Sequence, residues 1–363
     1  MCHPSGSAPR PAGNPIPYQN SVNLPEILHR LGCSLVVSTY QAGKLVTVGS
    51  HAGELVFGLA SFNKPMGVAR TPSGLVVGGM AEVWTLPGYT GIAARLPPEG
   101  THDIAFLTRS AHLTGAVLGH ELAWGKQGLW LVNTLFSCLC TLEDPWSFRP
   151  RWQPPFISSL EQGDRCHLNG LAMDPQQGTP AYVTALGESD EPGGWRQRKA
   201  EGGCLIAVDS GEVVLRGLSM PHSPRLHQGR LYLLDSGHGR LVVCDPAAGR
   251  IDTICELPGF TRGLDLFGDF AAVGVSKIRE KEVFGDLPIS RSDTPLRCGV
   301  AIVHLPSARV VAQLWFNAGV DEIFACTLLP GHRNPIVVGP HDAMDQQEPI
   351  WIVPPDTTLE VEF

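Results

Sequence analysis

Three histidines in this sequence have side chains and surroundings suited to metal or acid-base chemistry. His120, His167 and His222 each lie in a short segment that mixes polar and apolar residues, such as RCHLNGLAM at 165–173. Imidazoles that converge with a carboxylate are ligands for a divalent transition metal such as zinc, iron, copper or manganese, whereas calcium prefers oxygen ligands. The histidines are 47 and 55 residues apart, which matches no local metal motif. Their convergence therefore has to come from the fold.

A repeated segment gives the reason to expect such convergence. Its pattern is one variable residue, then a small or acidic residue, an apolar residue and a further, mostly small residue. The copies are MGVA, HELA, NGLA, HSPR, RGLD and DEIF, and their variable residues are Met66, His120, Asn169, His222, Arg262 and Asp321. The innermost strand of each blade of a β-propeller lines the central channel, so these six side chains should form a ring. His167 lies next to Asn169, closer to the channel mouth, and could instead bond only to its own loop.

Residues near this ring supply further candidate functions. Glu121, Asp321 or Glu322 could act as an oxygen ligand or as a catalytic base. The candidate substrate-binding residues are two ring members, two turn residues and one aromatic residue of a long loop, namely Asn169, Arg262, Asn133, Asp235 and Trp195. Three alternatives stay open. The ring could be only a set of polar side chains bonded to water. Arg262 could pair with Asp321 instead of binding a carboxylate or phosphate. Trp195 could simply pack its own loop.

Paired apolar strands recur along the chain and indicate the fold. Four runs have two short strands around a tight turn, and three more carry an insertion between the strands. They span 35–49, 75–86, 129–142, 231–245, 181–209, 271–305 and 335–353. With 41 glycines, 31 prolines and one helical segment at 23–32, this pattern predicts an all-β protein that forms a single β-propeller. Six inner strands and seven hairpins are compatible with six or seven blades. The segments near residues 35 and 353 should meet to close the ring.

Three long insertions are expected on one face of the propeller. They occupy 185–203, 276–297 and 341–348. The connection that enters the inner strand of a blade and the loop between its second and third strands emerge on the same face, so these insertions should overhang the ring. Loops of this length in a compact domain usually carry function. We therefore expect a functional lid at the channel mouth.

The composition limits the partners and the compartment. A net charge of −8 and the lack of any Lys/Arg run argue against nucleic acid and anionic membranes as partners. No stretch approaches the roughly 18 apolar residues of a membrane helix. Residues 1–23 lack the apolar core of a signal peptide and are expected to be disordered, and the propeller domain is expected at 24–363. Ten scattered cysteines without a CxxC pair favour buried thiols in a cytoplasmic protein.

Several segments resemble a family of bacterial conserved hypothetical proteins that is defined only as a domain of unknown function. These segments are SLVVSTYQAGKLVTVG, FNKPMGVA, HELAWGKQGLWLVNT, RCHLNGLAM and MPHSPRLHQGRLYLLDSGHGRL, and the resemblance extends over roughly residues 25–350. It implies a single β-propeller and brings no catalytic residues. More distantly, the plan is similar to that of calcium-dependent lactonase and strictosidine-synthase-like propellers. Their metal ligands are Glu, Asn and Asp, whereas this ring contains His120 and His222, so lactonase activity does not follow.

The sequence leads to two functional hypotheses from different classes. The first is a metal-dependent enzyme, a hydrolase, lyase or oxidoreductase, that acts on a small polar or anionic substrate at the channel mouth. The second is a metal-free propeller that binds a peptide or protein through its insertion loops. Motifs for dinucleotide, P-loop, zincin and GxSxG hydrolase sites are absent from the sequence. The metal content of the purified protein separates the two hypotheses.

Overall fold

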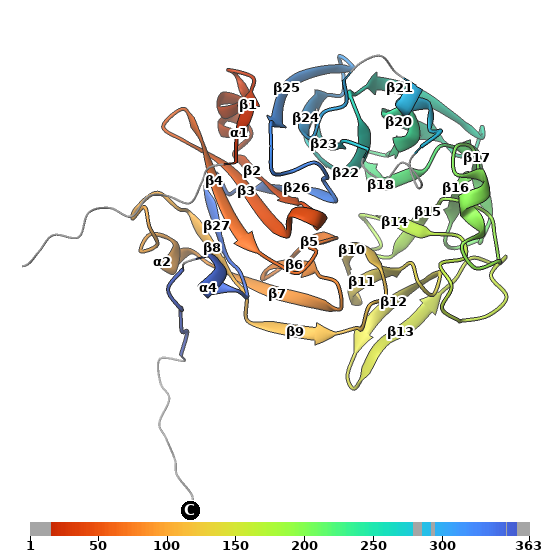
Figure 1. Cartoon of the computed structure of the whole chain (residues 1–363), viewed down its shortest axis with the longest axis horizontal. Helices are drawn as coiled ribbons and strands as arrows, with labels where there is room; N and C mark the ends of the chain where they lie inside the picture. The colour runs from red at the N-terminus through yellow and green to blue at the C-terminus, as the bar shows by residue number, and fades with distance from the viewer. Residues whose placement is uncertain (1–15, 279–284, 292–294, 346, 354–363) are drawn as a thin grey trace, which may run out of the picture.

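Six β-sheets surround a central axis in the computed structural model of the chain (Figure 1). The structure describes residues 16–278, 285–291, 295–345 and 347–353. Each sheet is one blade of a propeller, and its innermost strand lies nearest the axis. The predicted all-β propeller is therefore confirmed, and it has six blades.

The blades are numbered here in the order in which the chain enters their hairpins. Blade 1 contains β26 (Ala325–Pro330), β2 (Cys33–Ser38), β3 (Lys44–His51) and β4 (Glu54–Ser61), and blade 2 contains β5 (Val68–Thr71), β6 (Gly74–Gly78), β7 (Glu82–Tyr89), β8 (Ile104–Leu107), β9 (Ser110–Leu113) and β27 (Pro335–Val338). Blade 3 contains β10 (Gly119–Gly125), β11 (Gly128–Asn133), β12 (Cys138–Glu143) and β13 (Trp146–Trp152), and blade 4 contains β14 (Leu168–Met173), β15 (Pro180–Ala185), β16 (Gly203–Ala207) and β17 (Val213–Leu218). Blade 5 contains β18 (Pro221–His227), β19 (Arg230–Asp235), β20 (Arg240–Asp245) and β21 (Arg250–Glu256), and blade 6 contains β22 (Phe260–Phe267), β23 (Phe270–Ser276), β24 (Gly299–His304), β25 (Arg309–Phe316) and β1 (Tyr18–Asn20).

The two ends of the propeller sequence share blade 1. β26 supplies its inner strand and pairs antiparallel with β2, with Cys33 opposite Pro330 and Ser38 opposite Ala325. The hairpin at 35–49 therefore completes blade 1, whose inner strand is β26, and does not form a seventh blade. Closure of this kind removes the exposed sheet edges that a linear array of blades would leave.

The prediction of a hairpin at 335–353 is wrong. β27 pairs in parallel with β8 at the outside of blade 2, with Pro335 opposite Ile104. Residues 347–353 form no strand. The segment near 353 thus does not close the ring, because β26 already occupies the inner position of blade 1. The sequence pattern could not separate an outer parallel strand from half of a hairpin, since both are short apolar runs.

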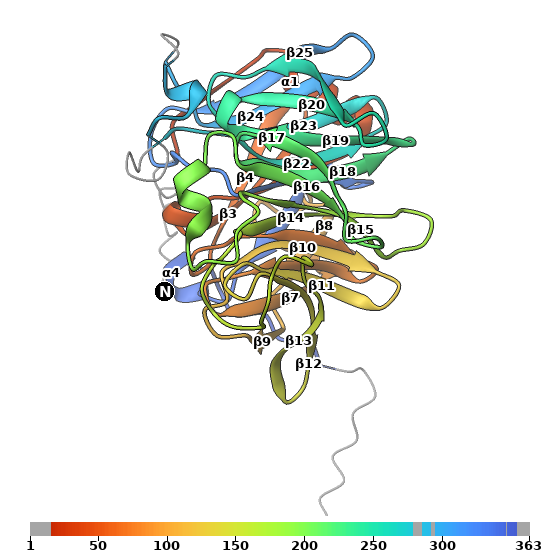
Figure 2. The same ribbon diagram turned by 90° about the vertical axis from the view of Figure 1, so that its right-hand side faces the viewer.

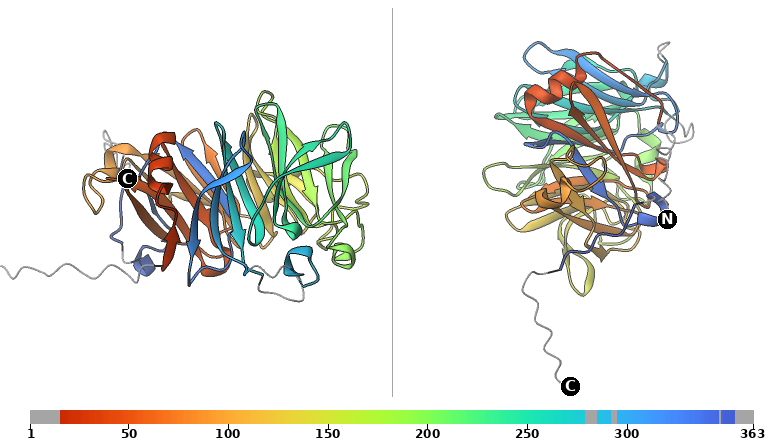
Figure 3. Two further views of the ribbon diagram at one scale, coloured as in Figure 1. Left: turned by 90° about the horizontal axis from the view of Figure 1, so that it is seen from above. Right: turned by 90° about the vertical axis from the view of Figure 1, so that its left-hand side faces the viewer.

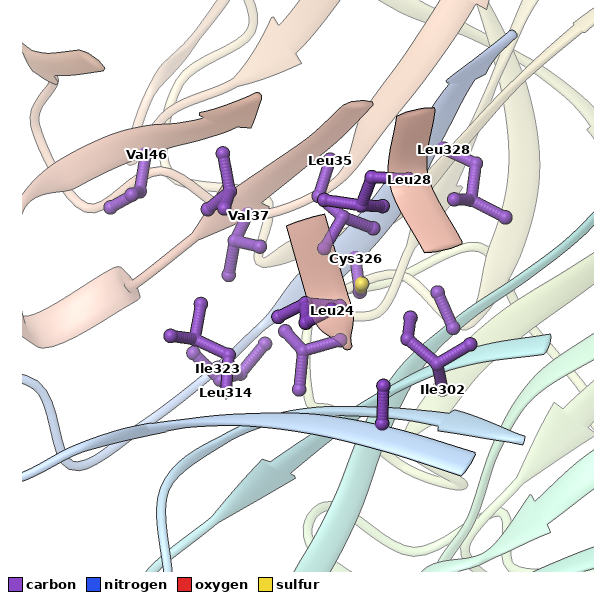
Figure 4. Close-up of a cluster of buried hydrophobic side chains, with 14 of the residues drawn as sticks. Leu24, Leu28, Leu35, Val37, Val46, Ile302, Leu314, Ile323, Cys326 and Leu328 are labelled. Atoms are coloured by element: carbon purple, nitrogen blue, oxygen red, sulfur yellow. The ribbon is translucent and has the colours of Figure 1, made fainter. Parts of the chain in front are cut away.

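Residues 16–23 belong to the segment predicted to be disordered, and the structure places a short strand in them. β1 pairs with β25 at the edge of blade 6, and α1 (Leu24–Leu31) follows it. α1 is the helix expected at 23–32, and its Leu24 and Leu28 pack into an apolar cluster with Leu35 and Leu314 (Figure 4). Residues 1–15 of the predicted disordered segment lie outside the described residues.

The remaining helical turns gather mainly on one face of the propeller. The helical elements besides α1 are α2 (Thr90–Ala93), α4 (Asp342–Asp345), η1 (Tyr40–Ala42), η2 (Gly194–Arg198), η3 (Ser236–His238) and η4 (Pro288–Arg291). η2, η4 and α4 come from the three insertions, and Figures 2 and 3 show them on the same side of the blades. The predicted placement of the insertions on one face is therefore confirmed for their described parts.

The interior consists of apolar clusters between neighbouring blades. The nine cysteines of the described residues form no disulfide bond and eight of them are buried, as their scattered positions predicted. Within the same part of the chain, no helix is long and apolar enough to cross a membrane.

Candidate functional site

A cavity of about 250 Å³ includes insertion residues such as Trp195 and Ile278 in its lining, so it lies on the face that carries the insertions. We call it the mouth cavity. It is lined by residues around the starts of the inner strands, by second-strand ends and by insertion residues: Tyr40, Gln41, Met66, Leu118, His120, Asp164, His167, Leu186, Trp195, Arg196, Met220, His222, Phe260, Arg262, Ser276, Lys277, Ile278, Glu322 and Phe324. Below it lies a chamber of about 10 Å³, which we call the inner chamber and which shares His120, His222, Arg262 and Phe324 with the mouth cavity. The inner chamber has room for about one water molecule.

The predicted ring is largely present. Four of its members, Met66, His120, His222 and Arg262, line the mouth cavity, and Asn169 lines the inner chamber beneath them. The propeller therefore brings together side chains that are far apart in the sequence, as the alignment of the inner strands predicted.

The sixth ring position differs from the prediction. β26 begins at Ala325, so Asp321 lies before the strand, where its carboxylate accepts a bond of 2.8 Å from Lys277 Nζ. Phe324 and Glu322 line the cavity from this blade instead. The sequence DEIF at 321–324 matches the repeated pattern, but β26 begins only after it. The side chain of Phe324 therefore lies at the channel in place of Asp321.

A repeated backbone conformation precedes four of the ring residues. Lys64, Leu118, His167 and Met220 each stand two positions before a ring residue, and their φ angles are +49°, +53°, +50° and +47°. A left-handed conformation is uncommon for residues other than glycine and costs of order 1 to 3 kcal/mol. Its recurrence in four blades turns the chain into each inner strand in the same way, and it places His167 at the mouth, as predicted.

His120 and His222 have nearly identical surroundings. His120 Nδ1 lies 2.9 Å from the Leu118 carbonyl and 2.9 Å from the Thr134 hydroxyl. His222 Nδ1 lies 2.8 Å from the Met220 carbonyl and 3.1 Å from the hydroxyl of Ser236. The carbonyl can only accept, so Nδ1 carries a hydrogen in both rings.

Burial keeps both of these imidazoles neutral. It lowers the pKa of His120 well below its ordinary value, and the charges of His167 and Arg262 act in the same direction. Burial and the charge of Arg262 likewise lower the pKa of His222. The two rings therefore present neutral side chains to the cavity at physiological pH.

His167 is held by a carboxylate that the sequence pattern did not single out. Its Nδ1 lies 2.8 Å from Asp164 Oδ1, and Trp195 Nε1 donates to the other oxygen of Asp164 at 3.1 Å. The His167 ring lies 4.5 Å from the Trp195 ring and 4.7 Å from the ring of His120, measured between centroids. Trp195 thus packs its loop and also lines the cavity, and its role in substrate binding remains a prediction.

Arg262 is the buried cation of the site. Its residue is 8% exposed, and its guanidinium carbon lies 3.4 Å from the centroid of the Phe324 ring. Nη1 lies 3.6 Å from Glu322 Oε1, and Nη2 is buried without a hydrogen-bond partner among the described residues. Burial lowers the pKa of Arg262 to about 10, although Glu322 acts against this shift, so the group stays charged at neutral pH. The predicted alternative of an Arg262–Asp321 pair is not the contact that forms.

Glu121 lies at the inner chamber and not at the mouth cavity. Its carboxylate binds Arg225 through two contacts, Oε1 with Nη2 at 3.0 Å and Oε2 with Nη1 at 3.3 Å. Burial raises the pKa of Glu121, and Arg225 opposes this shift. Both side chains line the inner chamber, and the ion pair gives Glu121 a structural partner where the sequence suggested a catalytic base.

Two predicted substrate-binding residues do not line the cavity. Asn133 Oδ1 accepts a bond of 3.1 Å from the backbone N–H of Phe136 and stabilises a turn. Asp235 accepts from the backbone N–H of Ser219 at 2.7 Å and pairs with His238 at 2.8 Å. Both are the last residues of the second strands of their blades, and their side chains bond to the adjoining loops.

In the described part of the chain, no group of three or more His, Cys, Asp or Glu side chains is arranged so that it could hold a metal ion. His120, His167 and His222 are thus not arranged as such a group, and the metal site predicted there remains a prediction. Asp164, Phe324 and Lys277 are cavity residues that sequence reasoning missed. Only the position of Asp164, three residues before His167, offered a signal.

A comparison with known protein families identifies the family of this chain. The model of the family described as Domain of unknown function (DUF4915) matches residues 22–338. The chain belongs to this family. The resemblance identified from the sequence is thereby confirmed, and the family description assigns no activity. No protein with a curated description matches the sequence.

Two solved structures show how general the fold is. One is a structure of a nidogen/laminin complex, with a TM-score of 0.50 and 11% identity over 82% of this chain and 99% of that chain. The other is a protein of unknown function from Bacteroides caccae, with a TM-score of 0.50 and 10% identity over 82% of this chain and 98% of that chain. At this identity the DUF4915 chain shares only the fold with them, so its function has to be argued from its own site.

Proposed function

We propose that the mouth cavity is the active site of an enzyme that acts on a small organic anion, with the charged group of the substrate bound to Arg262. One observation carries the proposal. The guanidinium of Arg262 is buried and charged, and its Nη2 has no hydrogen-bond partner among the described residues. Burying such a donor costs free energy unless an acceptor satisfies it, and carboxylates and phosphates are the acceptors whose geometry matches the guanidinium edge.

The size and lining of the cavity support a small substrate. A volume of about 250 Å³ lies just below the range of roughly 300 to 1,000 Å³ that is usual for drug-sized ligands. Phe324 covers one face of the guanidinium, and Arg262 lines both the mouth cavity and the inner chamber. Met66, Leu186 and Phe260 provide apolar surface beside the polar groups.

Acid-base groups beside the cation support catalysis in addition to binding. His167 is oriented by the Asp164 carboxylate, and such a carboxylate–imidazole pair is a common general base. His120 and His222 add two neutral imidazoles within the same cavity. Bases next to an anion-binding arginine suit proton transfer to or from the bound anion.

Metal dependence is a second candidate, favoured by the way the histidines are held. Histidine ligands of metals usually donate their other ring N–H to a carbonyl or carboxylate, as His120, His167 and His222 do here. Elemental analysis of protein purified without chelator tests it. This candidate requires stoichiometric zinc, iron, copper or manganese that is lost on replacing His120 or His222 with alanine, and metal-free protein would contradict it.

A thermal-shift screen tests the proposed function. A ligand that binds only the folded state raises the melting temperature, so small carboxylates, inorganic phosphate and short peptides can be compared in one experiment. We expect at least one small carboxylate to stabilise the wild type and to lose this effect in Arg262→Ala. Arg216→Ala is the matched control, because Arg216 pairs with Glu188 outside the cavity. Stabilisation by peptides alone would favour a peptide-binding propeller instead.

A further inference from the structure

The mouth cavity contains hydrogen-bond acceptors that a simple anion cannot satisfy. The hydrogens of His120 and His222 are fixed on Nδ1 by carbonyls, so Nε2 of each neutral ring carries a lone pair. No partner for either Nε2 is present in the residues that the structure describes, and both rings line the cavity. The ligand of this site therefore has to donate hydrogen bonds as well as accept them.

His167 has the same tautomer for a different reason. The carboxylate of Asp164 accepts the hydrogen of Nδ1, so in the neutral ring Nε2 is again the acceptor. The rings of His167 and His120 are 4.7 Å apart, so their acceptors serve one region of the cavity. Arg262 Nη2 is the complementary donor.

This deepens the proposed function and rests on it. We propose that the substrate is a hydroxylated carboxylic acid, whose carboxylate binds Arg262 and whose hydroxyl groups donate to Nε2 of His120 and His222. A carboxylic acid without a hydroxyl group offers no donor to these two acceptors. A site built to bind a hydroxyl group discriminates strongly against the analogue that lacks it.

An amino acid is the other small carboxylate that could donate to these nitrogens. Its ammonium group would bring a second positive charge close to the buried guanidinium of Arg262, where water screens poorly. A hydroxyl group donates without that charge. The structure therefore favours hydroxy acids over amino acids of equal size.

Matched ligands test the assignment directly. Titration calorimetry with lactate, propionate and alanine, and with malate and succinate, compares acids of similar size that differ in one substituent. We expect each hydroxy acid to bind the wild type at least about tenfold more tightly than its partner without the hydroxyl. In His222→Phe and His120→Phe this ratio should fall to within about threefold. His304→Phe is the control, because His304 lies at the end of β24 and bonds only within its own turn.

The outcomes separate this inference from the proposed function. Equal binding of both members of a pair, with both weakened by Arg262→Ala, would overturn the hydroxy-acid assignment and leave the anion site intact. Affinities that Arg262→Ala does not change would overturn the proposed function itself. A wild type that binds none of these probes contradicts the assignment as well. If the histidine variants do not fold, ¹⁵N spectra of the wild-type imidazoles decide, and a hydrogen on Nε2 of His120 and His222 would refute the assignment.

Discussion

Replacing Glu121 with glutamine should destabilise the propeller without weakening the mouth cavity. Glutamine keeps the volume of the side chain but removes the charge that both terminal nitrogens of Arg225 contact at 3.0 and 3.3 Å. Removing one member of a buried ion pair costs roughly 3 to 5 kcal/mol because the other charge stays behind. The carbonyls of Leu171 and Pro224 still accept from Arg225, so we expect a loss near the lower end, about 3 kcal/mol.

Calorimetric melting provides the assay for this variant. At an unfolding entropy of about 2.1 cal/mol/K per residue, one kcal/mol lowers the melting temperature of this 363-residue chain by about 1.3 °C, so a decrease of about 4 °C is expected. Glu143→Gln removes an ion pair with Arg149 on the outer strands, where solvent screens both charges, and should leave the melting temperature unchanged. A Glu121→Gln protein that melts like the wild type but binds the anion at least tenfold more weakly would refute the structural role and restore Glu121 as a site residue.

Three further predictions follow from the geometry. Gly274→Ala should weaken anion binding and lower the melting temperature, because the added Cβ would lie 2.2 Å from the carbonyl oxygen of Arg262; unchanged calorimetric affinity would contradict this. Burial lowers the pKa of His120 and His222, so the unfolded chain binds more protons at acid pH and stability should fall as the pH drops through about 6.5. Melting temperatures from pH 8 to pH 5 check this, and His222→Phe should show a smaller decrease. Asp164→Ala removes the acceptor of the Trp195 N–H and should release this indole, which a shift in tryptophan fluorescence would report and an unchanged spectrum would disprove.

Much of the fold could be predicted because each blade contains a pair of strands that are adjacent in sequence. Each hairpin alternates apolar residues between small turn residues, and this local pattern survives in six blades. The closing of the ring was harder to predict, since β26 and β27 are isolated apolar runs without a hairpin partner next to them in sequence. Their partners lie nearly 300 and about 230 residues away, and only the folded sheet selects them.

In the site too, the features that a local sequence pattern marks could be predicted, and those that depend on contacts between distant segments could not. Ring residues such as His120 and His222 were found because the inner strands repeat. The Asp164 carboxylate was missed because its contact with His167 depends on a left-handed turn that no residue pattern marks. The stacking of Arg262 on Phe324 joins two blades, so it depends on a strand register that the sequence left open.

Calorimetric titration of the stabilising carboxylate into the wild type, Arg262→Ala and Arg216→Ala tests the central claim most directly. If the mouth cavity binds an organic anion through the unpartnered edge of Arg262, the affinity should fall by at least about tenfold in Arg262→Ala and stay unchanged in Arg216→Ala. Equal affinities for all three proteins would contradict the account, because the anion would then bind somewhere other than this cavity.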